Sequence, residues 1–209
     1  MQSCRARQQV RIRTLAALQA TDWTNTPVVV CDDPTLETAH QRQTELVHRI
    51  LRQAVSHGEQ WILLLEDDLI FNALIRHNLR LWYPLRMSSP DQHFFASLYH
   101  PASVPLSWQS PERNYGRADV STVWGSQAVL LSRKTARYIL TCWGVQQGPH
   151  IDLKLARLAA RVCPLIYHIP SLVQHVGYES VWGGPFSSSS DFDREWKAGE
   201  SEELADLRK

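Results

Sequence analysis

Glu66, Asp67 and Asp68 form an acidic triplet directly behind the apolar run 61–65, which has the composition of a buried strand. Carboxylates packed side by side repel one another and are costly to remove from water. Such a cluster therefore needs a cation, a basic partner or open water in front of it. Hard oxygen ligands suit Mg²⁺ or Mn²⁺, which one or two carboxylates often hold while substrate phosphates complete the shell. One interpretation of the triplet is a divalent-metal site that grips a diphosphate.

Two other interpretations of the triplet stay open from the residues alone. In the first, it is a solvated turn in which one acid caps the following helix. In the second, the stretch 62–69 resembles the opening strand and acidic pocket of a response-regulator receiver domain. In that family the strand begins the fold, whereas here residues 1–60 already carry an α/β pattern. Asp119 also lacks a preceding apolar strand, and Lys134 lacks the expected proline, so both positions depart from the receiver pattern.

The elements that must position the triplet alternate between helical and strand patterns, and the strands are nearly continuous apolar runs. This alternation is typical of a parallel sheet covered by helices on both faces. The sequence therefore predicts an α/β fold, a Rossmann-like α/β/α sandwich with a mixed, mostly parallel sheet. Helices are expected over 8–20, 36–57, 72–82, 133–143 and 149–160, strands over 26–34, 61–68, 93–100, 121–132 and 164–170, and a loop over 101–116.

Length and charge restrict the classes of protein to consider. The chain has 209 residues, which favours a single domain over 1–209, and its net charge of +1 offers no basic field for nucleic acid or an anionic membrane. The longest uncharged apolar stretch is far shorter than the roughly 20 residues of a membrane helix. The amino-terminal residues lack the apolar core of a secretory signal, so we expect a cytoplasmic protein without a membrane span.

Two further features concern the ends and the thiols. Low apolar density over 186–209 predicts an exposed or flexible tail. The four cysteines show no C-x-x-C pair, which predicts buried free thiols and not a zinc site or a disulfide framework: Cys4, Cys31, Cys142 and Cys163.

The acids also stand where a ligand is expected. In open α/β sheets the ligand crevice lies at the carboxyl ends of the strands, and both Asp32-Asp33 and the triplet follow apolar runs. Several further segments then follow in a defined order: "TLAALQATDWTNTPVVVCDDP", "WILLLEDDLIF", "WGSQAVLLSRKTARYIL", "HIDLKLARL" and "PLIYHIPSLVQHVGYES". In that order they resemble the glycosyltransferases of the A type, which bind a nucleotide sugar on a single α/β domain. The Glu-Asp-Asp form is similar to that of N-acetylglucosaminyl transferases.

The resemblance implies roles for individual residues. Asp68 would contact a divalent metal, Mn²⁺ or Mg²⁺, while Glu66 and Asp67 would face the ribose or donor sugar. Asp152 would be the general base, and His175 a late metal or phosphate ligand. From the residues alone, His175 is equally a hydrogen-bonded structural histidine, and Asp152 an acid stabilised by the helix dipole.

The acceptor side and the first strand are less clearly marked. Trp124, Gly125 and Ser126 would line the acceptor site, although ordinary turn chemistry and core packing explain them as well. Members of the family begin with an apolar strand. Here either that strand is very short or the chain starts inside it. Arg5 and Arg7 fall where it would meet the nucleotide, and they would pair with its phosphates.

The expected activity is transfer of a hexosyl or N-acetylhexosaminyl group from a nucleoside diphosphate sugar to an acceptor hydroxyl on a glycan or other molecule. UDP-sugars are the favoured donors, and inversion at the anomeric carbon is expected if Asp152 is the base. The alternative is a non-catalytic or regulatory module that binds a nucleotide sugar on the same fold.

Overall fold

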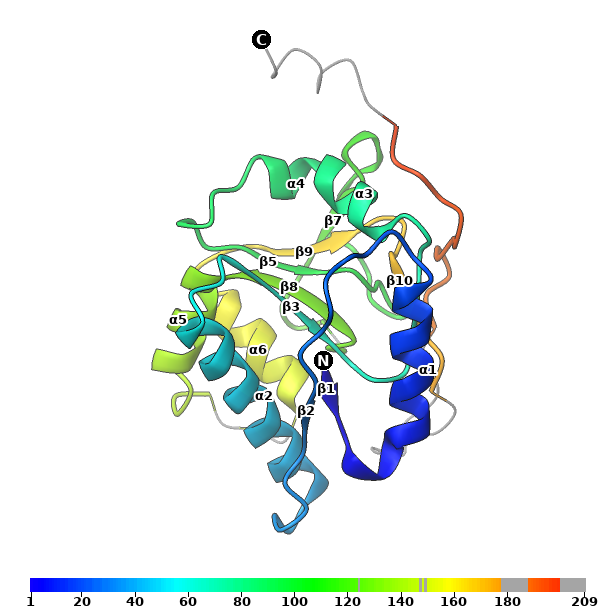
Figure 1. Cartoon of the computed structure of the whole chain (residues 1–209). Coiled ribbons are helices and arrows are strands. Elements are labelled where there is room, and N and C mark those ends of the chain that lie inside the picture. Colours follow the sequence, from blue (N-terminus) through cyan, green and yellow to red (C-terminus); the bar gives the residue numbers. More distant parts are fainter. Residues whose placement is uncertain (124, 147, 149, 178–187, 200–209) are drawn as a thin grey trace.

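The computed structural model describes residues 1–123, 125–146, 148, 150–177 and 188–199 (Figure 1). Its strands are β1 (Gln2–Ser3), β2 (Val30–Cys31), β3 (Trp61–Leu65), β4 (Leu69–Phe71), β5 (Phe95–Ser97), β6 (Trp108–Ser110), β7 (Tyr115–Ala118), β8 (Ala128–Ser132), β9 (Leu165–His168) and β10 (Val173–His175). Its helices are η1 (Arg5–Arg7), α1 (Gln8–Gln19), α2 (Ala39–Ser56), α3 (Ile75–Leu81), α4 (Tyr83–Arg86), η2 (Pro111–Arg113), α5 (Arg133–Thr141) and α6 (Ile151–Ala159). The predicted mixture of helices and strands is confirmed.

A six-stranded sheet with the order β3-β8-β5-β9-β7-β6 forms the centre of the fold. Only β5 and β9 pair in parallel, and the other four pairings are antiparallel. The prediction of a mostly parallel sheet is therefore wrong, although the sheet is mixed. Antiparallel neighbours need no helical crossover, and the described residues between β5 and β8 contain no α-helix. The expected loop over 101–116 instead contains β6 and the start of β7, which form a hairpin at the sheet edge.

Both faces of this sheet are buried, because successive side chains of a strand point to opposite faces. Ile62 and Leu64 belong to a core that includes α2, α5 and α6, whereas Leu65 and Leu130 belong to a second core with α1 and α3. Figure 1 shows α2, α5 and α6 together on one side of the sheet and α3 with α4 on the other. The expected layering of helix, sheet and helix is confirmed.

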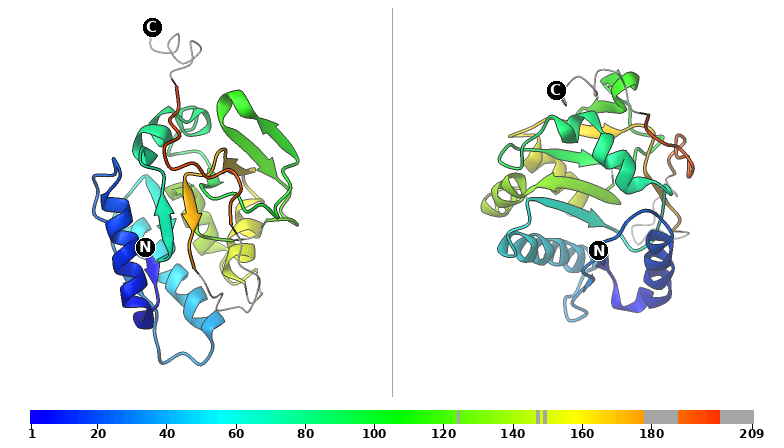
Figure 2. Two further views of the ribbon diagram at one scale, coloured as in Figure 1. Left: turned by 90° about the vertical axis from the view of Figure 1, so that its right-hand side faces the viewer. Right: turned by 45° about the horizontal axis from the view of Figure 1, so that its top comes forward.

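The expected first strand is present as β1, and its length agrees with both expectations, a very short strand or a chain that starts inside the strand. β1 has two residues and pairs in parallel with β2. The apolar stretch over 26–34 forms a strand only at Val30–Cys31, and Val28 is 59% exposed. A strand needs a partner along its length, and a two-residue β1 offers no more. The left view of Figure 2 shows β4 between α1, in blue, and the orange β10.

Local chemistry explains where α2 begins. The expected helix over 36–57 starts at Ala39 because Thr38 forms a capping box with Gln41. The helix expected over 72–82 is α3, which ends before Trp82 because the ψ of that residue, 118°, is extended, and the short α4 follows it.

Most of the described residues of the tail expected to be exposed or flexible over 186–209 are exposed, and a few buried contacts hold them between 188 and 199. Asn72 donates from Nδ2 to the carbonyl oxygens of Asp193 (2.9 Å) and Trp196 (2.8 Å), and Ala198 is buried. A few buried anchors hold this polar segment, which average apolar density does not reveal. Residues 186–187 and 200–209 lie outside the described part of the chain.

Two negative expectations can be compared with the structure. The four cysteines are free thiols, but each is partly exposed, so the prediction that they are buried is wrong. Among the described residues, no helix combines the length and the apolar character that crossing a membrane requires.

Candidate functional site

A cavity of about 260 Å³ lies at the carboxyl end of β3. Its walls include most of the residues singled out in the sequence: Arg7, Glu66, Asp67, Asp68, Gly125, Ser126, Asp152 and His175. Arg5 is not among the residues that line this cavity; its side chain is exposed, and its backbone N–H donates to Asp32. Trp124 lies outside the described residues.

The antiparallel β8 explains why distant segments meet here. Its amino end lies beside the carboxyl end of β3, where the Glu66 N–H donates to the Gln127 carbonyl at 2.9 Å. This pairing places Gly125 and Ser126 against the acidic triplet. On the other side, β10 pairs with β4 and brings His175 opposite Leu69, next to Asp68.

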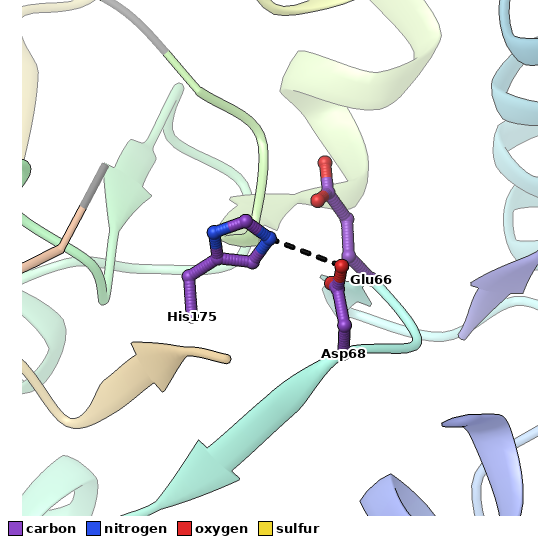
Figure 3. Close-up of side chains that lie close together, drawn as sticks. All are labelled: Glu66, Asp68 and His175. Carbon is purple, nitrogen blue, oxygen red and sulfur yellow. Dashed lines mark hydrogen bonds and ion pairs between the residues drawn. The ribbon is translucent and has the colours of Figure 1, made fainter. Parts of the chain in front are cut away.

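Three side chains converge as a possible set of metal ligands. Glu66, Asp68 and His175 each offer one ligand atom, and these atoms lie within 4.8 Å of one another. His175 Nε2 is 3.0 Å from Asp68 Oδ2. Figure 3 shows the imidazole pointing at the Asp68 carboxylate, with the Glu66 carboxylate beside it.

The carboxyl group of Glu66 accepts hydrogen bonds from two neutral side chains. Its Oε1 accepts hydrogen bonds from Ser126 Oγ (2.9 Å) and Gln2 Nε2 (3.3 Å). Burial, and then the negative charge of Asp68, raise the pKa of Glu66 to about 7. A bound dication would favour the ionised carboxylate.

Arg7 supplies the positive charge that the acids face. Its NH1 lies 2.9 Å from Asp67 Oδ1, and its NH2 lies 2.6 Å from Asp68 Oδ2. Burial opposes ionisation of Asp68, but hydrogen bonds from His175 and Arg7 outweigh it and lower the Asp68 pKa. Burial raises the pKa of Asp67, although hydrogen bonding from Ser3 and the charge of Arg7 partly offset it.

Asp152 stands in the first turn of α6 and faces the same cavity. Its Oδ2 accepts a hydrogen bond from the Gly125 N–H at 2.8 Å, and its Oδ1 accepts one from the Leu153 N–H at 2.8 Å. The carboxylate is therefore held in place by backbone donors on both sides.

The residues fit a divalent ion in three respects. They supply two carboxylates and an imidazole, a donor set that Mn²⁺ accepts. Asp68 Oδ1 is buried and accepts no hydrogen bond from the described residues, so it remains available as an acceptor. Space is kept by Gly177, where a Cβ would lie 2.6 Å from Asp68 Oδ2 and 2.8 Å from His175 Nε2.

Sequence reasoning missed several polar and small residues of this site. Ser3 donates to Asp67 Oδ2 at 2.6 Å, Gln2 reaches Glu66, and Gly177 leaves the space described above. Gly177 follows His175 by two positions, which was the available signal for it. Nothing in the sequence around Gln2 and Ser3 marks them, because their role depends on where β1 lies.

Comparison with known proteins adds no relative. No protein-family model matches the chain, and no curated protein matches it either.

Proposed function

We propose that the chain is a metal-dependent glycosyltransferase of the A type that moves a sugar from a nucleoside diphosphate sugar, with UDP-sugars favoured, to an acceptor hydroxyl. One observation carries the proposal. Residues singled out in five separate stretches of the sequence line a single cavity, where Glu66, Asp68 and His175 lie within reach of one ion.

The donor side of the mechanism rests on Asp68, His175 and Arg7. Asp68, His175 and Glu66 would hold Mn²⁺ or Mg²⁺, which when bound supplies positive charge against a diphosphate leaving group. Arg7 lines the same cavity and carries a planar guanidinium suited to phosphate oxygens. The ion held by these residues would set where the diphosphate binds, and Arg7 would add a further positive charge beside it.

The acceptor side rests on Asp152. As general base, its carboxylate takes the proton of the acceptor hydroxyl while that oxygen attacks the anomeric carbon from the face opposite the diphosphate. Hydrogen bonds from Gly125 and Leu153 orient the carboxylate, and correct positioning supplies much of the rate. Attack from that face gives inversion, so an NMR assay showing a product of retained configuration would remove Asp152 from that role.

Titration calorimetry tests the metal and donor sites together. UDP is titrated with and without Mn²⁺ into the parent protein and into Asp68→Ala. Mn²⁺ should strengthen UDP binding to the parent, and Asp68→Ala should lose most of that gain. Equal UDP affinity in all four conditions would remove the assignment.

The alternative, a nucleotide-sugar-binding module without turnover, is favoured by one observation, the two-residue length of β1. A strand this short leaves little backbone to support a nucleotide. Hydrolysis of a panel of nucleotide sugars by the purified protein separates the two functions. Melting shifts with a donor but no hydrolysis of any donor would support the module.

A further inference from the structure

Arg7 and the proposed ion compete for one oxygen. Asp68 Oδ2 lies 2.6 Å from Arg7 NH2 and 3.0 Å from His175 Nε2, and Asp68 belongs to the group of possible metal ligands. An ion bound between Asp68 and His175 would place two further positive charges beside the guanidinium. Like charges at this separation repel strongly in a partly buried site. The contact between Arg7 and Asp68 is therefore the one that ion binding weakens most.

The second contact of Arg7 does not share this conflict. Its NH1 lies 2.9 Å from Asp67 Oδ1, and Asp67 is not among the three grouped ligands. Asp67 is itself fixed, because Ser3 Oγ donates to its Oδ2 and Thr14 Oγ1 donates to its carbonyl oxygen, both at 2.6 Å. The guanidinium can leave Asp68 and keep this anchor.

A released guanidinium would have a new partner nearby. The Arg7 side chain is 31% exposed and lines the cavity, so an anion that enters can reach it. A diphosphate bound to the ion brings such an anion to this place, and a planar guanidinium binds phosphate oxygens in pairs.

We propose that Arg7 and the metal ion compete for Asp68. Without the ion, the guanidinium bridges Asp67 and Asp68; when the ion binds, the guanidinium leaves Asp68 and binds the diphosphate instead. This inference rests on the proposed function. It makes Arg7 a positioning residue that couples two ligands, since release by the ion prepares the diphosphate site. Coupling of this kind is reciprocal, so bound UDP must strengthen ion binding by the same factor.

Calorimetry on the full chain tests the exchange with Mn²⁺ alone, UDP alone and UDP at saturating Mn²⁺. Arg7→Gln should bind Mn²⁺ alone more tightly, by about fivefold or more, because the competing cation is gone. Mn²⁺ should strengthen UDP binding to the parent by a certain factor. In the same variant this factor should be smaller by about fivefold or more.

Arg11→Gln is the matched control. Arg11 also packs at this end of the fold, but its NH1 contacts Ser3 Oγ (2.9 Å) and Cys31 Sγ (3.6 Å), not the acids. This variant removes the same charge and should change both quantities less than twofold. A change as large as that of Arg7→Gln would show a general charge effect and overturn the exchange.

The remaining outcomes are separable. The inference would be overturned if Arg7→Gln binds Mn²⁺ as the parent does and if Mn²⁺ strengthens its UDP binding by the same factor. The metal site itself would still stand if Asp68→Ala abolishes Mn²⁺ binding. Parent and Asp68→Ala that bind Mn²⁺ equally would instead remove the proposed function, and the inference with it. If melting curves show that Arg7→Gln does not fold, Arg7→Lys keeps the charge without the bridging fork, and it should shift both quantities in the same direction by a smaller factor.

Discussion

Gly177 stands where any side chain would collide with Asp68. A Cβ built on this glycine lies 2.6 Å from Asp68 Oδ2, closer than a carbon and an oxygen can pack. The backbone of Val176 donates to the Asp68 carbonyl oxygen at 2.9 Å, so this segment cannot easily move away. The glycine therefore preserves the space in front of the two ligand atoms.

Gly177→Ala should weaken Mn²⁺ binding by about 10- to 100-fold, the usual effect of disturbing the surroundings of metal ligands. The methyl group would displace the Asp68 carboxylate or the His175 imidazole. Mn²⁺ titration by calorimetry measures the loss. Gly144→Ala is the control, because a Cβ there meets no atom of the described residues within 4 Å. Unchanged Mn²⁺ affinity in Gly177→Ala would place the ion elsewhere.

Asp152→Asn should cut sugar transfer by about a hundredfold or more, the usual contribution of a general base, with UDP binding nearly unchanged. Asparagine keeps an oxygen to accept the Gly125 N–H, so the loop should keep its place, and only the basic group is lost. Single-turnover transfer assays and UDP calorimetry give the two readouts. Full transfer activity in this variant would show that another group takes the proton.

Local patterns predicted much of the fold. The run 61–65 predicted β3 because it is continuously apolar, and the stretch 8–20 predicted an element close to α1, although α1 buries only Thr14 and Leu18 and leaves Ile12 exposed. They did not predict which strands are neighbours. The pairing of Leu65 with Ala128 depends on contacts far apart in the chain, and strand periodicity does not record them.

The candidate site was likewise predicted in part. The order of the segments pointed to Asp68 and His175 as possible metal ligands and to Glu66 as a residue facing the donor, whereas the structure places Glu66 with the other two as a third possible ligand. The phosphate role expected for Arg7 stays a prediction, but its ion pairs with Asp67 and Asp68 were not foreseen. They arise because β1 and η1 run beside the end of β3, an arrangement that the polar amino-terminal residues do not reveal.

Gly125→Ala should destabilise the fold by about 1–3 kcal/mol, because Gly125 has a φ of +87° that other residues adopt only with strain. A Cβ would also lie 2.1 Å from Gln127 Oε1. Urea unfolding measures the change. Adding Gln127→Ala removes the collision but not the backbone strain, so the double variant should recover only part of the loss. Complete recovery would show that the collision alone matters.

His168 should make the protein less stable as the pH falls from about 6.5 to about 4. Burial lowers its pKa from 6.5 to about 4, although the hydrogen bond from Nδ1 to the Pro170 carbonyl opposes the shift. The unfolded chain takes up a proton on this residue in that window and the folded chain does not. Stability is therefore full above pH 6.5 and declines below it, by about 3 kcal/mol at pH 4.

Urea unfolding of the parent and of His168→Asn between pH 4 and pH 7 isolates this contribution. Asparagine can donate to the Pro170 carbonyl but does not titrate, so the stability difference between the two proteins should be largest at pH 7 and shrink toward pH 4. Other groups titrate in both proteins and cancel in the difference; among them, His100 has a raised pKa, because hydrogen bonding to Asp191 outweighs the effect of burial, and so favours folding at low pH. A difference that stays constant with pH would mean that His168 binds its proton equally well in the folded chain, which burial between Trp82 and Trp196 should prevent.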